Sequence, residues 1–342
     1  MKQIGVRSQK RFALVSIVIV IILAVVSGSM FYLNSRQSYA GKMESITVGQ
    51  VPGESMALLY VAQDRHFFSN NGLNVTTKDY VNGVAAVDAL AKNEVDIAGS
   101  AEYAIVKAAF QKENISIIAN RDKDIFLTLH GRKDRGFGNI TDLKGKTIGI
   151  DQQTIQAFYL ARFLELHGMS TRDVTLVNVQ APQAVDAISN GSVDAVISPE
   201  LYSYQIQQKL TNEVVSWSIQ SNQPTYDVIV CRNDWIARHP DIVNRFLKSL
   251  AQAQEYLERH PAESEAITQR RLNYSNEYMA FVWSDDQFSL SLDQSLILAM
   301  EDEARWMIKN NLTSEKKTPD FLDYIYSDGL NTIKPGSVNI IR

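Results

Sequence analysis

The sequence contains one cysteine, Cys231, among 342 residues. A single cysteine excludes an internal disulfide framework, a cysteine-based metal cage and an iron–sulfur cluster. The five histidines are scattered, none belongs to a HExxH or similar short metal-binding spacing, and Asp-rich calcium loops are missing. We therefore predict no metal site and no cofactor, and we expect Cys231 to be a small buried residue of a strand.

Motifs of common enzyme classes are missing as well. The sequence has no G-x-S-x-G nucleophile elbow, no G-x-x-x-x-G-K-[ST] phosphate loop and no G-x-G-x-x-G dinucleotide motif. Acidic and basic residues are mixed along the chain, its formal net charge is −4, and no basic stripe is available to neutralise phosphates. These absences favour a binding protein over an enzyme and argue against nucleic acid as a partner.

The N-terminus carries the most specific local signal. Four basic residues precede an apolar run from Phe12 to Leu33, which is long enough to cross a bilayer as one helix. We predict a cytoplasmic segment at 1–11, a transmembrane anchor at 12–33 and a polar linker at 34–44, with the remainder in the periplasm or on the outer face of the cytoplasmic membrane. Ser38-Tyr39-Ala40 also has the spacing of a signal-peptidase site, so a signal peptide cleaved after Ala40 is the alternative.

From Ser45 onward, strand-like runs alternate with helical patterns, which predicts an α/β fold with parallel sheets and helices on their faces. The length of the chain suits two domains. We expect strands at 45–50, 74–80, 95–99, 115–121, 125–130, 146–151, 174–179, 193–198 and 226–231. We expect helices after the last strand at 234–239, 241–260, 261–272 and 293–309.

An internal repeat divides this region into two halves. The residues VDAL at 87–90 and VDIAGSAE at 95–102 return as VDAI at 185–188 and VDAVISPE at 193–200. Each copy is typical of a helix, a turn, a strand and the start of a second helix, with Ser100 and Ser198 as N-caps and Pro199 in the first turn. We interpret the repeat as one α/β unit present in each of two lobes, although a similar sequence pattern can also recur in any βαβ protein.

Four segments carry a family resemblance. They are ALLYVAQDRHFFSNNGLNV at 57–75, NEVDIA at 93–98, ITDLKGKTIG at 140–149 and DWIARHPDIV at 234–243. In order and spacing they resemble the nitrate, sulfonate, taurine and thiamine-pyrimidine precursor binding proteins of ABC importers. The resemblance implies a type II periplasmic-binding-protein fold, in which two doubly wound α/β lobes enclose a ligand cleft. It places the crossovers near Arg132 and Pro224, with 45–130 plus 226–342 as lobe 1 and 131–225 as lobe 2.

The same resemblance implies a function. It indicates an extracytoplasmic subunit that captures a small organic solute and delivers it to an ABC permease and its ATPase. Fungal thiamine-pyrimidine synthases resemble this fold too, so such an enzyme is one alternative, although Cys231 stands alone where those enzymes carry a cysteine-rich motif. A membrane-tethered solute sensor is another alternative.

Candidate ligand-binding residues follow from the fold. Ligands of open α/β sheets bind beyond the carboxyl ends of strands, where helix N-termini present unpaired N–H groups. Five such segments are expected at 50–56, 81–84, 100–103, 151–156 and 198–202. Their hydroxyl residues also suit helix caps, their glycines tight turns and their aromatics half-buried packing. The candidates are Gln50, Gly53, Glu54, Ser55, Asn82, Gly83, Ser100, Glu102, Tyr103, Gln153, Thr154, Phe158, Ser198, Glu200, Tyr226 and Asp227.

The charge of these segments bears on the ligand. None of the five contains Lys or Arg, whereas Glu54, Glu102, Asp151, Glu200 and nearby Asp227 are acidic. A bare anion such as nitrate would therefore face carboxylates. We expect a solute that carries an amine or an aromatic nitrogen, such as an aminosulfonate or an aminopyrimidine, with aromatic side chains to stack on a ring or cover a cation.

Overall fold

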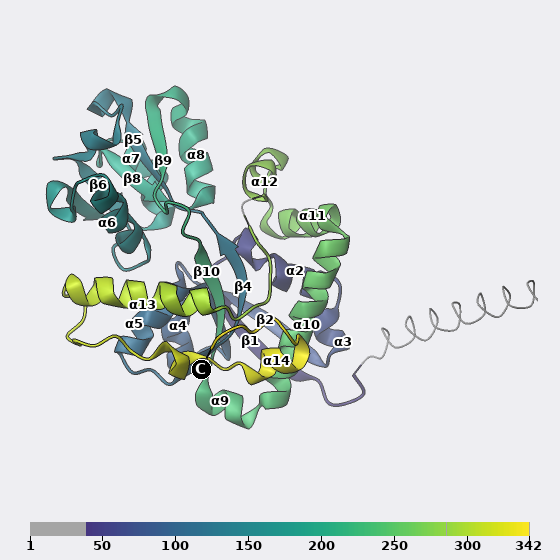
Figure 1. Ribbon diagram of the computed structural model, residues 1–342. Helices are drawn as coiled ribbons and strands as arrows, with labels where there is room; N and C mark the ends of the chain where they lie inside the picture. Colours follow the sequence, from purple (N-terminus) through teal and green to yellow (C-terminus); the bar gives the residue numbers. More distant parts are fainter. Residues whose placement is uncertain (1–38, 285, 342) are drawn as a thin grey trace, which may run out of the picture.

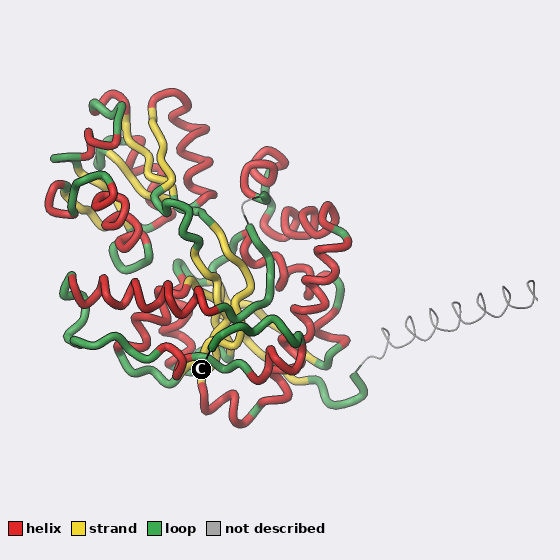
Figure 2. The backbone as a smooth tube through the Cα atoms, in the orientation of Figure 1, coloured by secondary structure: helices red, strands yellow, loops and turns green. Residues whose placement is uncertain are grey.

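The computed structural model describes residues 39–284 and 286–341. Two five-stranded sheets organise this part of the chain, and helices pack around each of them (Figure 1, Figure 2). The segments predicted at 1–11 and 12–33 lie outside the described residues. Between residues 39 and 341, with residue 285 set aside, no helix combines the length and the apolar character needed to cross a membrane.

The first sheet has the strand order β2-β1-β3-β10-β4. Its strands are β1 (Glu44–Gln50), β2 (Leu73–Asp79), β3 (Ile97–Ala101), β4 (Ile115–Asp124) and β10 (Thr225–Arg232). Strand β1 pairs in parallel with β2 and β3, whereas β10 runs antiparallel to β3 and β4.

The second sheet repeats this layout in the order β7-β6-β8-β5-β9. Its strands are β5 (Thr128–Arg132), β6 (Thr147–Ile150), β7 (Thr175–Asn178), β8 (Ala195–Ser198) and β9 (Val214–Ser218). Strand β5 runs antiparallel to β8 and β9. Both sheets are therefore mixed: the parallel pairing expected from the sequence is present among β1, β2 and β3 and among β6, β7 and β8, whereas β5 and β10 run antiparallel. The chain comes from the other lobe before β5 and before β10, and it starts both strands at the carboxyl ends of the parallel strands. These two strands are therefore antiparallel to the strands beside them.

The chain passes between the sheets twice, at 125–127 between β4 and β5 and at 219–224 between β9 and β10. The return near Pro224 lies where we expected it. The first crossover lies at 125–127 and not near Arg132, where we expected it. The predicted strand 125–130 is in fact the crossover followed by the start of β5, which belongs to the second sheet. Strand β9 was missed, since it is a short edge strand with an alternating pattern directly after a helix.

Gln220 links the two crossovers. Its side chain is 1% exposed, and its Oε1 accepts hydrogen bonds from the backbone N–H groups of Phe126 (2.7 Å) and Leu127 (2.8 Å). Its Nε2 donates to the carbonyl oxygen of Asp124 at 3.3 Å and to Oγ1 of Thr225 at 3.2 Å. Nε2 also donates to the carbonyl oxygen of Gln223 at 3.1 Å. One buried amide thus satisfies backbone groups of both crossovers.

The repeat has a structural counterpart at two aspartates. Oδ2 of Asp96 accepts from the backbone N–H of Thr47 at 2.8 Å, and Oδ2 of Asp194 accepts from that of Thr147 at 2.9 Å. In each case the aspartate's own N–H donates to the carbonyl of the same threonine at 2.9 Å. The Val-Asp pair therefore recurs because it joins the turn before β3 and β8 to the strands β1 and β6.

Helices of both lobes surround the sheets. Those of the first half are η1 (Glu54–Met56), α2 (Ala57–Asp64), α3 (Phe67–Asn70), α4 (Gly83–Ala91) and α5 (Glu102–Phe110). The second lobe has η2 (Lys133–Arg135), η3 (Ile140–Leu143), α6 (Gln156–Leu166), η4 (Thr171–Asp173), η5 (Ala181–Gln183), α7 (Ala184–Ser189), α8 (Glu200–Leu210) and η6 (Thr211–Glu213). The last third has α9 (Asn233–Arg238), α10 (Pro240–Arg259), α11 (Pro261–Leu272), α12 (Asn276–Val282), α13 (Gln294–Lys309), η7 (Phe321–Tyr324) and α14 (Asp328–Ile333).

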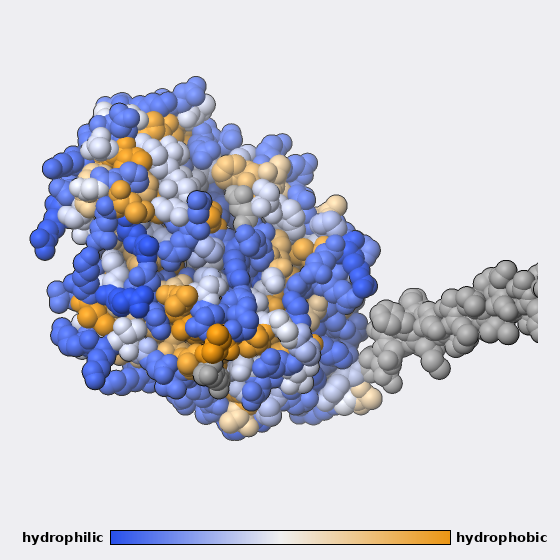
Figure 3. Space-filling model, viewed as in Figure 1, coloured by the Kyte–Doolittle hydropathy of each residue, from blue (hydrophilic) through white to orange (hydrophobic). Residues whose placement is uncertain are grey.

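The helices predicted after the last strand are confirmed as α9, α10, α11 and α13. Pro240 and Pro261 each occupy the first position of a helix, where a missing N–H costs nothing. Helices α10 and α11 pack against α2, and α13 packs against α5, so this C-terminal part covers the first lobe. Cys231 is fully buried in β10, as expected. Hydrophilic residues cover most of the face seen in Figure 3, and apolar residues form small groups between them.

Candidate functional site

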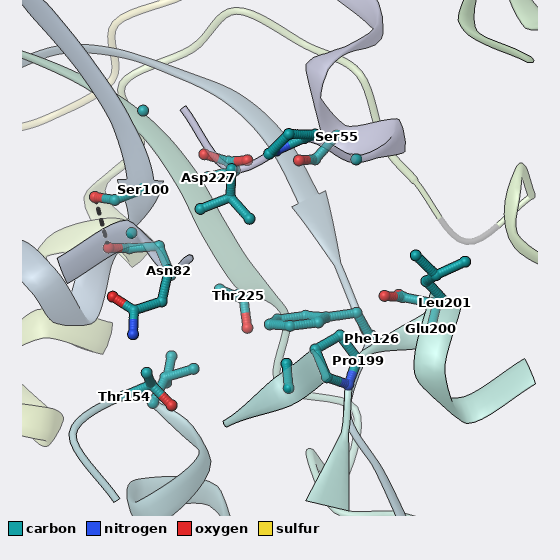
Figure 4. A pocket seen from close by; sticks show the side chains of 18 of the residues that line it. Ser55, Asn82, Ser100, Phe126, Thr154, Pro199, Glu200, Leu201, Thr225 and Asp227 are labelled. Carbon is teal, nitrogen blue, oxygen red and sulfur yellow. Dashed lines mark hydrogen bonds between the residues drawn. The ribbon is translucent and has the colours of Figure 1, made fainter. Parts of the chain in front are cut away.

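A cavity of about 640 Å³ lies between the two sheets and receives residues from both lobes (Figure 4). All five segments expected from the sequence contribute to it, at 51–55, 81–84, 100–103, 151–156 and 199–202. Strand ends and turns add further lining residues, among them Asp79, Tyr80, Gly99, Arg121, Asp124, Phe126, Thr225, Asp227 and Tyr274. The rule that ligand sites lie beyond the carboxyl ends of strands therefore describes the position of this cavity well.

The cavity brings together ten of the sixteen candidate residues. Those that line it are Gly53, Glu54, Ser55, Asn82, Gly83, Ser100, Tyr103, Thr154, Glu200 and Asp227. The lining does not include Gln50, Glu102, Gln153, Phe158, Ser198 and Tyr226. The second group lies in or next to the same segments, but its members are buried in the core or, like Gln153, exposed on the surface.

Contacts explain most of these exclusions. Nε2 of Gln50 donates to Oδ1 of Asp79 at 3.0 Å, inside the first sheet. Glu102 is fully buried, and its Oε2 accepts from the backbone N–H of Tyr226 at 3.2 Å. Phe158 packs edge-on against Trp306 of α13, with ring centroids 5.6 Å apart. These residues support the walls of the cavity.

Two expected helix caps are shifted by one residue. Helix α5 starts at Glu102 with Ala101 as its N-cap, and α8 starts at Glu200 with Pro199 as its N-cap. Ser100 and Ser198 are strand residues instead. Oγ of Ser100 donates to the carbonyl oxygen of Ala101 at 3.1 Å, while Ser198 is fully buried. The Ser100 hydroxyl therefore lines the cavity without capping the helix.

One end of the cavity, called here the polar end, is formed by Asn82, Ser100, Asp151 and Thr154 (Figure 4). Oδ1 of Asn82 caps α4 by accepting from the N–H of Ala85 at 3.0 Å, and Nδ2 of Asn82 donates to Oδ2 of Asp151 at 3.2 Å. Oγ1 of Thr154 donates to the carbonyl oxygen of Asp151 at 2.9 Å. These amide and hydroxyl groups suit a polar, hydrogen-bonding part of a solute.

Arg121 is the one basic side chain in the lining, and sequence reasoning missed it. It is 3% exposed, and its Nη2 donates to both carboxylate oxygens of Asp227 at 2.9 Å. Gly99 makes room for the guanidinium, since a Cβ at that position would lie 2.4 Å from Nη1. Arg121 ends the strand predicted at 115–121, so applying the strand-end rule to every strand would have found it.

The opposite end, called here the acidic end, contains Glu54, Asp124 and Glu200. Oε1 of Glu54 accepts from the hydroxyl of Tyr278 at 2.9 Å, and burial raises the pKa of Glu54. Burial and then the neighbouring Asp122 raise the pKa of Asp124 well above its usual range. With Asp79, Asp151 and Asp227, six carboxyl groups line the cavity against one guanidinium. A positively charged group at the acidic end would stabilise the ionised carboxylates.

Aromatic side chains complete the lining. Tyr80 and Tyr103 come from the first lobe, Phe126 from the first crossover, Tyr202 from α8 and Tyr274 from the turn after α11. Figure 4 shows Phe126 and Pro199 beside Glu200, across the cavity from Asn82 and Ser100. Faces of this kind can stack on a planar ring or cover a cation.

The two lobes also touch on both sides of the cavity. On one side Arg162 of α6 pairs with Asp302 of α13, and Nζ of Lys309 lies 3.0 Å from Oε1 of Glu165. On the other side the ring of Tyr204 on α8 lies 5.3 Å from that of Tyr278 on α12. These contacts join the two lobes on either side of the cavity.

Two α/β lobes joined by paired crossovers, with a cavity between them, define the periplasmic-binding-protein class of fold. Residues 54–264, more than half of the chain, match the family model described as NMT1/THI5 like, and the chain belongs to this family. The taurine-binding periplasmic protein of Escherichia coli K12 is 27% identical over 206 residues, which are 57% of this chain and 61% of that protein. A putative thiamine biosynthesis protein of Haemophilus influenzae is 25% identical over 233 residues, covering 66% and 73% of the two chains.

Solved structures share the fold at lower identity. The alkanesulfonate-binding protein SsuA of Xanthomonas axonopodis pv. citri, solved with bound MOPS, superposes with a TM-score of 0.72 at 18% identity, covering 84% of this chain and all of that one. The desulfurization enzyme DSZB superposes with a TM-score of 0.66 at 14% identity, covering 85% and 98%. The fold therefore serves binding proteins and at least one enzyme.

Proposed function

We propose that this chain is the extracytoplasmic solute-binding subunit of an ABC importer. The observation that carries the proposal is the cavity itself, which receives polar side chains from both lobes at the ends of strands and the starts of helices. A solute bound there would contact both lobes and stabilise the closed arrangement over an open one. The crossovers at 125–127 and 219–224 are the segments about which the lobes would move.

The lining favours a nitrogen-containing organic solute. Six carboxyl groups face one guanidinium, and Asp227 already neutralises that guanidinium. A bare inorganic anion would lose its hydration and gain unfavourable neighbours, whereas an amine or an aminopyrimidine would gain charge-assisted hydrogen bonds at the acidic end. An aminosulfonate would place its amine there and its sulfonate oxygens near the donors of the polar end.

A thermal-shift panel tests this proposal. The purified chain is heated with taurine, alkanesulfonates, nitrate, aminopyrimidines and other small nitrogen compounds at equal concentration. We expect at least one compound with an amine or a ring nitrogen to raise the melting temperature by mass action, and nitrate to have no effect. A response to nitrate alone, or to no compound, would contradict the proposed chemistry of the cavity.

The importer partnership requires its own evidence. Neighbouring genes that encode a permease and an ATPase would support it, as would co-purification with both. Isolation of the chain with a signalling protein instead would favour the membrane-tethered sensor. Sequencing the N-terminus of the mature chain would distinguish a retained segment at 12–33 from cleavage after Ala40.

An enzyme is the alternative function, because the desulfurization enzyme DSZB has the same fold. Cys231 gives this alternative little support. It lies in β10 outside the lining of the cavity, and burial raises the pKa of its thiol far above neutrality, so a nucleophilic thiolate is not available there. Turnover of pyridoxal phosphate in the presence of iron would establish synthase activity and overturn the binding-protein proposal.

A further inference from the structure

Helix α12 belongs to the C-terminal part of the chain, yet it packs against α8 of the second lobe (Figure 1). The ring of Tyr204 on α8 lies 5.3 Å from that of Tyr278 and 5.5 Å from that of Phe281, both on α12. Rings at these separations attract each other. On this side of the cavity, aromatic side chains of α12 and α8 therefore join the lobes.

Tyr278 connects α12 to the lining of the cavity. Its hydroxyl donates to Oε1 of Glu54 at 2.9 Å, and its ring lies edge-on to that of Tyr274, with centroids 4.6 Å apart. Glu54 and Tyr274 both line the cavity. Helix α12 therefore lies behind the wall of the acidic end, and its displacement would remove the support of two lining residues.

The buried residues of α12 lie outside the main hydrophobic core. Tyr278, Met279 and Val282 are each at most 2% exposed, yet they belong to neither of the two apolar clusters that form the core of the described residues. Elements with few apolar contacts to a core open locally at a lower free-energy cost than core elements do. Helix α12 can thus move while both sheets stay intact.

The turn before α12 provides a pivot. Helix α11 ends at Asn273, whose φ of 55° lies in the left-handed region. Nε2 of Gln269 holds the turn to α11 by donating to the carbonyl oxygen of Tyr274 at 3.2 Å. Helix α12 then starts after Ser275, whose Oγ accepts from the N–H of Tyr278 at 3.1 Å. A few turn residues between two capped helices are enough to absorb the rotation of a hinged segment.

We propose that residues 273–283, which are α12 and its flanking residues, form a gate over the acidic end of the solute cavity. When the ring contacts with α8 break, α12 moves away from the second lobe and opens a path to Glu54, while the lobes stay joined between α6 and α13. The gate controls exchange of the solute and in that respect rests on the function proposed above. The competing route is a rigid-body opening of whole lobes, which breaks both sets of inter-lobe contacts together.

Hydrogen exchange on the full chain tests whether α12 opens by itself. No solute is added, so the result is independent of the proposed transport function. We expect the amides at 278–283 to exchange faster than those of α10 and α13, and about tenfold faster again in Tyr204→Ala, which loses both ring contacts. Tyr204→Phe keeps the ring and should exchange as the wild type does. Unchanged exchange of α12 in Tyr204→Ala, or an equal rise throughout both lobes, would overturn the proposal.

A thiol placed inside the cavity tests whether the gate is the route of entry. Ser100 lines the cavity and is 4% exposed, while the native Cys231 is fully buried, so Ser100→Cys supplies the reactive thiol for monobromobimane. Adding Tyr204→Ala should accelerate labelling about tenfold. Removing both ion pairs on the opposite side, with Arg162→Ala and Lys309→Ala together, should leave the rate unchanged. Equal acceleration in the two backgrounds would show that whole lobes open and would contradict the gate.

A milder variant keeps the test valid if Tyr204→Ala fails to fold. Phe281 is 39% exposed, and Phe281→Ala removes one of the two ring contacts. We expect about a threefold acceleration of both α12 exchange and cavity labelling, with α10 and α13 unchanged. Rates equal to those of the wild type in both measurements would contradict the proposed role of α12.

Discussion

Asn82 and Asp151 join the two lobes directly across the cavity, with Nδ2 of the amide 3.2 Å from Oδ2 of the carboxylate. The same amide caps α4 through its Oδ1. One side chain thus orients a helix N-terminus towards the cavity and holds the opposite wall close to it. The pair is a direct hydrogen bond between the two walls of the polar end.

Replacing Asn82 with aspartate separates its two roles. Asn82→Asp keeps the cap, because a carboxylate oxygen can still accept from Ala85, but it places a negative charge against Asp151. We expect a loosened polar end and a roughly tenfold weaker affinity for the solute found in the panel, about 1.4 kcal/mol, measured by calorimetry. Combining it with Asp151→Asn returns a donor to the pair and should restore affinity. Equal affinities for all three proteins would show that the contact does not contribute to closure.

Gln220 offers a test of the connection between the lobes. Gln220→Ala leaves two backbone N–H groups at Phe126 and Leu127 without their acceptor in a buried place. We expect a loss of about 2–4 kcal/mol in the free energy of unfolding, measured by urea denaturation. Gln223→Ala is a suitable control, since Gln223 takes part in these contacts through its backbone carbonyl. A Gln220 variant as stable as the control would contradict the role assigned to this side chain.

Gly99 determines the position of Arg121. A methyl group at residue 99 would meet the guanidinium at 2.4 Å, so Gly99→Ala should displace Arg121 from Asp227 and cost about 1–3 kcal/mol of stability. Gly138→Ala, where a Cβ would have its nearest neighbour at 3.9 Å, should change stability little. Thermal melts of the two variants provide the comparison. Similar melting temperatures would mean that the arginine is not held in a fixed position.

His130 makes the second lobe sensitive to acid. Its ring nitrogens lie 2.8 Å from the hydroxyls of Ser216 and Ser203, and burial lowers its pKa from about 6.5 to about 4. The unfolded chain therefore binds a proton more tightly, so this contribution to stability is complete above pH 6.5 and is lost as the pH falls towards 4. Between pH 7 and pH 5 we expect the wild type to lose about 2 kcal/mol through His130.

His130→Asn isolates that contribution. Buried Glu102 and Glu303 have raised pKa values and favour the folded chain at low pH, but they are present in both proteins and cancel in the difference. Urea denaturation at the two pH values should give a smaller loss in the variant than in the wild type. An identical pH dependence would show that His130 accepts a proton in the folded chain as readily as in the unfolded one.

Much of the fold could be predicted because local signals agree with the final structure. The repeat of Val-Asp before β3 and β8 is visible in the sequence, and the prolines at 240 and 261 mark helix starts. The direction of β5 and β10 could not be predicted from the same signals, since a buried strand has the same pattern whether its neighbours run with it or against it. Our prediction misplaced the first crossover because residues 125–130 have the pattern of a single apolar strand.

The candidate site, like the fold, could be predicted from the sequence only in part. The strand-end rule located the cavity, yet it could not say which side chains of each segment turn inwards, so buried Glu102 and lining Glu200 looked equivalent. Asp124 lines the cavity close to Asp286, which lies far from it along the chain, so only the tertiary structure places these two carboxyl groups together.

A crystal structure with the compound that gives the largest thermal shift tests the central claim most directly. We expect that compound between the lobes, with a nitrogen within hydrogen-bond distance of a carboxylate of the acidic end and with contacts to residues of both lobes. A compound bound outside the cavity, or held by one lobe only, would contradict the account.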